Sequence, residues 1–278
     1  MRLFFVTLMV AFMSAFSSAH ATTDWLSGLG YKARLIDGAR QADGTYQAGF
    51  EIILEKGWST YWRVPGEYGI PPVFEFQNSS NINNIVVHWP APDVFLSGTG
   101  LTIGYKNRVV LPLTITPEAA TQKVELNLSA FFGVCSEICV PADAKASVSL
   151  YPQNTVPQDQ TIIDDAFVNV PTKPFENGLD VKTASFTSTE EAEHVYLRLQ
   201  LPESVSTVSV LTEGPQDWYF EPYVTDLSDK TQANKKTYMA KVPLYRLVRT
   251  ALSGEEELRV TVIADGTAIE KTISFSNL

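Results

Sequence analysis

The two cysteines of this sequence are the residues best suited to chemistry, and both lie in the stretch GVCSEICVP at positions 133–141. Three residues separate Cys135 from Cys139. In an extended strand, residues four apart are separated by about 13 Å, whereas the two Cα atoms of a disulfide lie within about 7 Å of each other. The chain must therefore curl for this pair to bond. A structural bond, a metal site and a redox centre are the three candidate roles.

A disulfide between these cysteines would close a ring of only five residues. The chain-entropy model assigns such a short loop about 2 kcal/mol of stabilisation, which is less than a cross-link between distant strands would give. A short, loop-borne disulfide is also more easily reduced, and this is a property of exchanging bonds. The spacing therefore favours a redox pair, with a structural bond as the alternative.

A metal site at the pair has little support elsewhere in the sequence. Two thiolates suit Cu(I), which commonly also binds methionine or histidine, but beyond the N-terminal segment the chain has only Met239, His88 and His194. A zinc site normally needs four ligands, and there is no second cysteine pair. We therefore expect no metal and no cofactor, and Cu(I) binding by the two thiolates is kept as an alternative.

The N-terminus has the layout of a secretory signal peptide. Arg2 precedes an apolar run from Leu3 to Phe16, and Ala19-His20-Ala21 is a small-x-small cleavage site. The run is shorter than the roughly 20 apolar residues that a membrane-spanning helix needs. We therefore expect residues 1–21 to be removed and the mature chain to begin near Thr22 as a soluble, exported protein, in a compartment where disulfides can form and persist.

The charge balance excludes some classes of partner. Loss of Arg2 would leave 20 basic and 31 acidic residues, a net charge near −11. An acidic protein is repelled by nucleic acid and by anionic membrane surfaces, so we expect no nucleic-acid partner. The sequence also has no GxSxG nucleophile elbow and no glycine-rich phosphate loop before a helix, which argues against the common hydrolase and nucleotide-binding motifs.

Strands dominate the pattern, including the segments that flank the cysteines. Residues Lys123–Phe131 alternate polar and apolar side chains, as a half-buried strand does, and another strand is predicted at Ala146–Tyr151. The cysteines would therefore lie at the tip of a hairpin-like connection. Many short strands separated by Pro, Gly and Asn predict an all-β protein built from sandwiches.

We expect two tandem immunoglobulin-like antiparallel β-sandwiches, at residues 22–152 and 176–278. The segment between them, residues 153–175, is rich in Pro, Gln, Asn and Asp, and it is predicted to be a linker with a short helix at Gln160–Val170. At the end of the second sandwich, two strands are predicted to form a hairpin around Asp265-Gly266, a dipeptide typical of tight hairpin turns.

Four sequence motifs occur in a distinctive order around the cysteines: GWSTYWRVPGEYGIPP (57–72), WPAPDVF (89–95), GYKNRVVLPL (104–113) and VCSEICVP (134–141). This set resembles the periplasmic N-terminal domain of the DsbD and ScsB thiol:disulfide interchange proteins. The resemblance covers Tyr31–Tyr151. The second half is similar, with less motif support, to the second immunoglobulin-like domain of ScsB-type periplasmic regions.

The resemblance implies a domain that relays electrons through Cys135 and Cys139. Such a domain receives electrons from a membrane thiol carrier or a thioredoxin-like protein, and it passes them to periplasmic client proteins that carry disulfides. Cys139, which precedes Val140-Pro141, matches the cysteine that forms the mixed disulfide, and Cys135 would be the resolving thiol. The clients would serve cytochrome c biogenesis, disulfide isomerisation or copper tolerance.

The resemblance also implies a cap over the cysteines. The segment Asp93–Gly98 is similar to the one that carries an aromatic lid in DsbD, so Asp93 and Phe95 are assigned to a cap loop. An apolar lid would keep other oxidants away from the reactive thiolate. Four more aromatic residues are assigned to the lining of the site, although sandwich cores also use aromatics freely; these are Trp58, Tyr61, Trp62 and Tyr105.

Two features differ from DsbD. The cysteines are separated by three residues, fewer than in DsbD and closer to the ScsB pattern, and the chain includes neither a membrane carrier nor a thioredoxin domain. We therefore interpret the protein as a protein-disulfide reductase component that needs a separate membrane partner. Two alternatives stay open, namely a non-catalytic protein-binding module with a structural disulfide and a Cu(I)-binding copper-tolerance protein.

Overall fold

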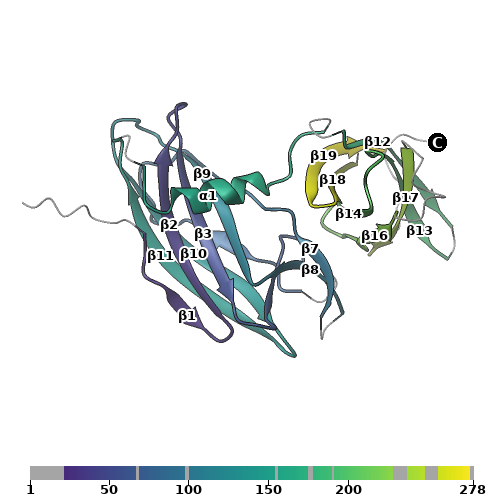
Figure 1. Cartoon of the computed structure of the whole chain (residues 1–278), viewed down its shortest axis with the longest axis horizontal. Coiled ribbons are helices and arrows are strands. Elements are labelled where there is room, and N and C mark those ends of the chain that lie inside the picture. The colour runs from purple at the N-terminus through teal and green to yellow at the C-terminus, as the bar shows by residue number, and fades with distance from the viewer. Residues whose placement is uncertain are drawn as a thin grey trace, which may run out of the picture.

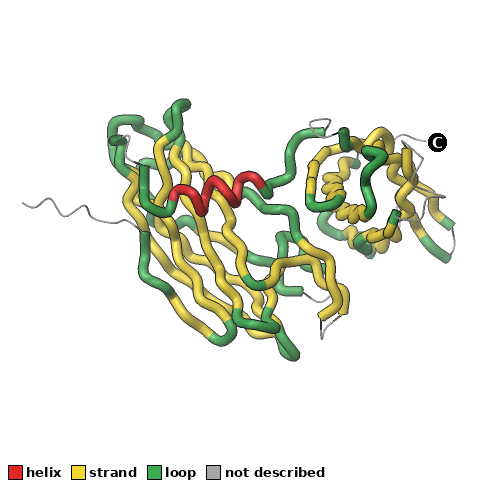
Figure 2. Tube along the Cα trace, viewed as in Figure 1, coloured by secondary structure: helices red, strands yellow, loops and turns green. Residues whose placement is uncertain are grey.

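The computed structural model of the chain describes residues 22–66, 69–97, 100–153, 156–174, 178–189, 191–227, 237–247 and 256–275. The predicted signal peptide, residues 1–21, lies outside the described residues. Strands make up most of the structure and form two groups of sheets that follow each other along the chain (Figure 1, Figure 2). The predicted all-β class is therefore confirmed. Within the described ranges, no helix is long and apolar enough to cross a membrane.

The first sandwich packs two antiparallel sheets face to face. One sheet has the strand order β1 (Leu26–Gly28), β2 (Tyr31–Arg40), β3 (Tyr46–Leu54), β9 (Arg108–Thr116) and β6 (Asn84–Val87). The other has the order β11 (Cys139–Leu150), β10 (Val124–Cys135), β4 (Ser59–Tyr61), β8 (Gly100–Lys106) and β7 (Asp93–Ser97), and β5 (Val73–Glu75) pairs with β10. Side chains of β10 alternate between buried and partly exposed up to Ala130, because successive residues of a strand point to opposite faces.

Aromatic side chains fill the space between these two sheets. Phe50 of β3 contacts Phe74 of β5 and Phe132 of β10 edge-to-face, with ring centroids 5.8 and 6.0 Å apart. Trp62 and Leu111, each 1% exposed, lie in the same core. Because edge-to-face pairs stabilise beyond the area they bury, this core gives firm support to the sheet that carries the cysteines.

The second sandwich follows the same principle with fewer strands among the described residues. One sheet has the order β12 (Asp180–Ser188), β13 (Glu193–Gln200), β17 (Thr237–Arg246) and β15 (Trp218–Phe220), and the other has β16 (Tyr223–Asp226), β14 (Thr207–Glu213), β18 (Glu257–Ala264) and β19 (Thr267–Ser274). The predicted hairpin at Asp265-Gly266 joins β18 to β19. Both turn residues have positive φ, 45° and 83°, as a tight two-residue hairpin turn requires.

The helix predicted between the sandwiches is present as α1 (Gln160–Val168). It lies across the outer face of β2, β3 and β9 (Figure 1). Ile163 is fully buried there and packs onto Gly49, where a Cβ atom would lie 3.2 Å from Ile163 Cγ1. The side-chain oxygen of Gln160 accepts a hydrogen bond from the backbone N–H of Ala39 at 2.6 Å. The helix therefore packs as part of the first sandwich, and the chain crosses to the second sandwich after it.

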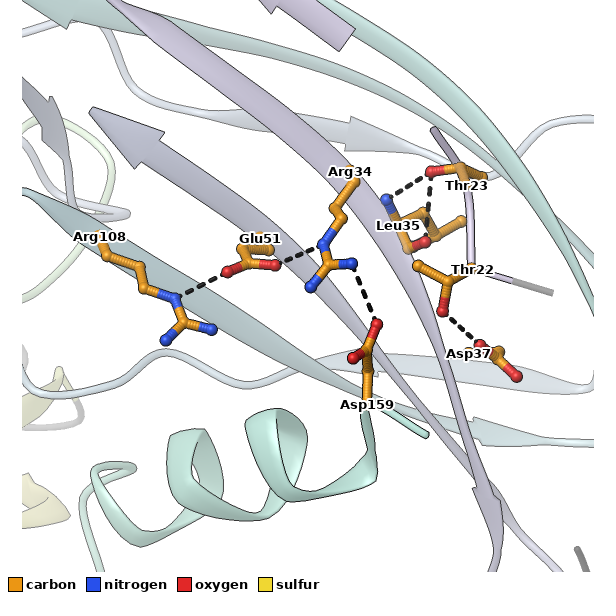
Figure 3. Close-up of polar contacts among 8 residues, drawn as sticks. All are labelled: Thr22, Thr23, Arg34, Leu35, Asp37, Glu51, Arg108 and Asp159. Carbon is orange, nitrogen blue, oxygen red and sulfur yellow. Dashed lines mark hydrogen bonds and ion pairs between the residues drawn. The ribbon is translucent and has the colours of Figure 1, made fainter. Parts of the chain in front are cut away.

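A row of charged side chains fastens the start of α1 to this sheet (Figure 3). Glu51 of β3 is 1% exposed and accepts hydrogen bonds from Nε of Arg34 at 2.6 Å and Nε of Arg108 at 2.7 Å. Arg34 also donates to Asp159, the residue before the helix, at 3.0 Å. A buried carboxylate is costly unless it is paired, so these arginines both neutralise Glu51 and hold the helix in place.

Candidate functional site

The cysteines lie opposite each other where one hairpin turns. β10 ends at Cys135 and β11 begins at Cys139, and the two residues are cross-strand partners with Cα atoms 4.1 Å apart. The backbone N–H of Ser136 donates to the carbonyl of Ile138 at 3.0 Å and closes the turn between them. This turn supplies the curl that the spacing requires, and the two sulfurs are joined in a disulfide.

The two sulfurs differ in accessibility. Cys135 is 2% exposed, because β4 pairs with the end of β10 and covers it on one side. Cys139 lies on the edge strand β11 and is partly exposed, next to Ile138, which is 63% exposed. A thiolate of another molecule can therefore reach Cys139 much more easily than Cys135.

One hydroxyl group contacts both sulfurs. The Oη atom of Tyr61, the last residue of β4, lies 2.8 Å from Sγ of Cys135 and 3.0 Å from Sγ of Cys139. Disulfide sulfurs carry no hydrogen, so the tyrosine O–H donates to them. A donor in this position stabilises negative charge on whichever sulfur becomes a thiolate, and hydrogen bonds to a charged form favour that form.

A glycine makes room for this tyrosine. Gly133 lies two residues before Cys135 on β10, and a Cβ atom there would lie 2.8 Å from Cε2 of Tyr61 and 2.8 Å from Cβ of Ile70. Thr60 donates from its hydroxyl to the Gly133 carbonyl at 2.7 Å and ties β4 to the same place. The aromatic ring can therefore lie against the strand only because residue 133 has no side chain.

A pocket of about 900 Å³ opens beside the disulfide. Its walls include the hairpin turn 136–138, residues 56–58 before β4, Ser59 at the start of β4, and Phe95 and Leu96 of β7. The apolar rim is unusually exposed, with Leu29 at 63%, Leu96 at 80% and Ile138 at 63%. Exposed apolar side chains gathered around a reactive group are typical of a surface that receives another protein.

The predicted cap segment forms part of this pocket. Phe95 lies in the wall that also includes Cys135, and Lys106 Nζ lies 3.9 Å from the centroid of its ring. Asp93 lies at the start of β7 and lines a different pocket, of about 410 Å³, on the side that faces α1. Gly98, at the end of the predicted cap segment, lies outside the described residues. The role of Phe95 as a lid stays a prediction.

The aromatic residues assigned to the site separate into two groups. Trp58 lines the pocket beside Cys135, and Tyr61 contacts the sulfurs. Trp62 lies in the core of the first sandwich, and Tyr105 is 7% exposed and donates from its hydroxyl to the Pro90 carbonyl at 2.8 Å. Burial raises the pKa of Tyr105 well above its usual value. These two residues do not line the disulfide pocket.

Sequence reasoning did not single out Gly133, Leu29 or Lys106. Gly133 had a readable signal, because a glycine inside a strand often marks a close approach of another group. The other two had none, since an isolated leucine and an isolated lysine are common on any surface. Among the described residues, there is no group of three or more His, Cys, Asp or Glu side chains that could hold a metal ion.

Comparison with known proteins places this site in a family. Residues 32–150, which include both cysteines, β4 and β7, match the family model described as the N-terminal domain of the thiol:disulfide interchange protein DsbD. Residues 32–150 belong to the DsbD N-terminal domain family. The first sandwich is therefore a DsbD-type thiol–disulfide interchange domain with its cysteine pair oxidised.

A solved structure extends the comparison to the second sandwich. The crystal structure of the N-terminal periplasmic domain of ScsB from Proteus mirabilis is similar over 93% of this chain and 99% of that chain, with a TM-score of 0.68 and 20% sequence identity. This likeness shows that the two proteins share a fold across both sandwiches. No curated protein sequence matches the chain significantly.

Proposed function

We propose that this DsbD-type protein is a periplasmic electron relay, in which Cys135 and Cys139 pass electrons from a membrane thiol carrier or thioredoxin-like protein to client proteins with disulfides. The observation that carries the proposal is the asymmetry of the disulfide, with one accessible sulfur and one buried sulfur under a shared tyrosine hydroxyl. A purely structural bond has no need of such an arrangement. The protein would act as a reductase component that depends on a separate membrane partner.

Reduction would begin at the accessible sulfur. A thiolate of the reduced partner attacks Sγ of Cys139, the S–S bond breaks, and Cys135 leaves as a thiolate that accepts the Tyr61 hydrogen bond. The second thiol of the partner then attacks the mixed disulfide and releases Cys139, so the partner becomes oxidised. Two electrons and two protons pass in total from the partner dithiol to the cysteine pair.

Delivery to a client would reverse these roles. The Cys139 thiolate attacks the client disulfide, forms a mixed disulfide and expels one client thiolate. Cys135 then attacks the sulfur of Cys139, which restores the internal disulfide and releases the second client thiol. The clients would be oxidised periplasmic proteins, such as those of cytochrome c biogenesis, disulfide isomerisation or copper tolerance.

The redox potential of the pair tests this proposal. The full chain would be equilibrated with glutathione and dithiothreitol buffers, and the reduced fraction would be measured by alkylation and mass spectrometry. We expect a potential between about −270 and −120 mV, the span of exchanging thioredoxin-fold pairs. A potential below about −300 mV is typical of structural disulfides and would contradict the relay.

The assignment of the two sulfurs has its own test, with two matched variants. Cys135→Ser leaves only the accessible thiol, and Cys139→Ser leaves only the buried one. Because reactivity requires access as well as thiolate character, we expect Cys135→Ser to form a mixed disulfide with oxidised glutathione about tenfold faster than Cys139→Ser does. Equal rates, or faster reaction of Cys139→Ser, would overturn the assigned roles.

A further inference from the structure

The second sandwich packs against the first through one face of the sheet β16-β14-β18-β19. Leu211 of β14 is 1% exposed and belongs to the core of the first sandwich, and Ile263 of β18 packs against that core. Thr261 of the same face is fully buried and donates to Glu270 of β19 at 3.2 Å. The contact between sandwiches therefore combines apolar packing with buried polar groups, and both are fixed in register by the strands that carry them.

Arg63 is the polar centre of this contact. It comes two residues after Tyr61 in the first sandwich, and its guanidinium group makes a two-pronged ion pair with Glu213, with contacts of 2.6 and 3.1 Å. The same group also donates to Glu270, and its Cζ lies 4.1 Å from the ring centroid of Trp62. The Arg63 side chain is only 14% exposed. A buried arginine held by two carboxylates is a geometrically specific anchor.

Three consecutive residues connect the disulfide to this ion pair. Tyr61 contacts the sulfurs, and Trp62 is buried in the core and donates from its backbone N–H to the Ile103 carbonyl at 3.0 Å. The guanidinium group of Arg63 then reaches Glu213 of the second sandwich. β4 pairs with β10 at Ser59 and Thr60, and with β8 at Ser59, Thr60 and Tyr61. Tyr61 is the last residue of the strand, so its position depends both on this pairing and on what holds the chain on its C-terminal side.

The need for this support is greatest when the cysteines are reduced. In the oxidised pair, the two sulfurs are bonded to each other, and the Tyr61 hydroxyl lies within hydrogen-bonding distance of both. Once the S–S bond is broken, the sulfurs can separate, and they no longer define one place for the hydroxyl. The backbone of β4 then has to keep Tyr61 in reach of the thiolate, because hydrogen bonds weaken steeply outside a narrow range of distance and angle.

Building on the relay function, we propose that Arg63 is a positioning residue through which the docked second sandwich holds the Tyr61 hydroxyl against the cysteine sulfurs. The second sandwich thereby favours the reduced form of the pair and increases the fraction of the Cys139 thiol that is ionised. Its role in exchange is to support the C-terminal end of β4, through the residue that lies two positions after Tyr61. Glu213 and Glu270 are the residues of the second sandwich that carry this support.

A double-mutant cycle in the full chain tests the coupling. The equilibrium constant for exchange with glutathione, and the pH dependence of Cys139 alkylation in the reduced protein, would be measured for the wild type, Arg63→Gln, Tyr61→Phe and the double variant. Arg198→Gln is the matched control, since Arg198 is exposed on β13, in the other sheet of the second sandwich. Arg63→Lys keeps the charge and is expected to restore part of the effect.

We expect Arg63→Gln to shift the glutathione equilibrium about fivefold toward the disulfide, the effect of one modest hydrogen bond, and to raise the pKa of the Cys139 thiol. Tyr61→Phe should do the same, and adding Arg63→Gln to Tyr61→Phe should change the equilibrium less than twofold, because the two residues act in series. Arg198→Gln should leave the equilibrium unchanged.

Three results would overturn the coupling: no shift in Arg63→Gln, fully additive shifts in the double variant, or an equal shift in Arg198→Gln. Each of these leaves the relay function intact, provided that the wild-type pair exchanges with glutathione. If the wild-type pair resists reduction, the relay itself fails before any variant is compared. Should Arg63→Gln unfold, the variant Glu270→Gln tests the same anchor from the second sandwich and must shift the equilibrium in the same direction.

Discussion

At the residue scale, the chemistry divides among three side chains. Cys139 is reachable, Cys135 is covered, and the hydroxyl of Tyr61 lies within hydrogen-bonding distance of both sulfurs. A donor that stabilises a thiolate makes it a better leaving group and increases the ionised fraction of an attacking thiol. In the proposed relay, the tyrosine would therefore serve both halves of the exchange, since each half has a thiolate at one of these two sulfurs.

We predict that a side chain at Gly133 lowers both the stability of the protein and the rate of exchange, because Tyr61 packs against this glycine. In Gly133→Ala, the new methyl group would lie 2.8 Å from the Tyr61 ring and from Ile70, so the ring must move away from the sulfurs. We expect a loss of about 1 to 3 kcal/mol in the free energy of unfolding, as for other overpacked cores, measured by urea denaturation. Reaction of the reduced pair with oxidised glutathione should also slow.

The matched control for that variant is Gly266→Ala, in the β18–β19 turn, at a glycine where an added Cβ meets nothing within 4 Å. Gly266 has a φ of 83°, so this control loses some stability through its backbone. It should leave the exchange rate of the folded protein unchanged. A Gly133→Ala protein that is destabilised but exchanges at the wild-type rate would show that Tyr61 does not contribute to the exchange reaction.

Phe95 is predicted to shield the disulfide. Because Phe95 forms part of the pocket wall with Cys135, Phe95→Ala should open that side and speed reduction of the disulfide by dithiothreitol about threefold or more, as expected when access limits the rate. Leu101→Ala changes an exposed position of the adjoining β8, and its disulfide should be reduced by dithiothreitol at the wild-type rate. If both variants react like the wild type, Phe95 is a wall residue and not a lid.

At the element scale, β10 and β11 form one long hairpin whose turn carries the disulfide, and α1 braces the other sheet of the same sandwich. The helix contacts the sheet through Ile163, Gln160 and the charged row that ends at Asp159. Phe167 near its end packs edge-to-face on His88, with ring centroids 5.1 Å apart. His88 also lies 2.8 Å from the hydroxyl of Thr114 on β9. The histidine therefore links the helix to the sheet.

This histidine makes a pH dependence predictable. Burial lowers the pKa of His88 below its usual value, so the unfolded chain binds the proton more tightly than the folded chain. Stability should then fall as the pH drops below about 6.5, the pKa of an unperturbed histidine, and keep falling until the folded-state pKa is passed. The urea midpoint at pH 7.5 and pH 5.5 measures this effect.

The comparison that isolates His88 uses a side chain that cannot titrate. His88→Gln should show a smaller decrease in the urea midpoint between pH 7.5 and 5.5 than the wild type, whereas His194→Gln should keep the full decrease. An unchanged decrease in His88→Gln would assign the acid sensitivity to other groups.

At the scale of the whole molecule, the two sandwiches are joined through the contact around Arg63. Arg63 forms ion pairs with Glu213 and Glu270, which follow it in the sequence by 150 and 207 positions. Burial lowers the pKa of Arg63, but the hydrogen bonds and charges of Glu213 and Glu270 more than offset this and raise it overall, so the group stays charged. Removal of Arg63, or of its two glutamate partners, would leave buried charge unpaired, which is strongly unfavourable.

The contact between sandwiches is predicted to open when charge is added to its apolar part. Leu211→Glu would place a third carboxylate beside Glu213 and Glu270 in a position that is 1% exposed, and a buried charge without a partner is costly. We expect small-angle scattering to show a larger radius of gyration for this variant. Val224→Glu, at a 53% exposed position on the neighbouring strand β16, should keep the wild-type radius.

Much of the fold was predictable from local pattern. The alternation in Lys123–Phe131, the turn at Asp265-Gly266 and the short helix near Gln160 each depend on a few consecutive residues. The cysteine spacing, together with the motifs around it, was enough to predict a local cysteine pair and the family of residues 32–150. These features are readable because strand period, turn conformation and spacing are properties of short stretches of chain.

Which aromatic residue meets the sulfurs was decided only by the tertiary structure. Tyr61 and Trp62 are adjacent in sequence, yet one contacts the disulfide and the other lies in the core. Their assignment depends on how β4 pairs with β10, a contact between residues more than 70 positions apart. The Arg63 anchor was equally hidden, since its partners lie in another sandwich. Sequence alone thus determined the cysteine pair and its family, whereas the hydroxyl, the pocket and the proposed support from the second sandwich arise from long-range register, which no short stretch of chain encodes.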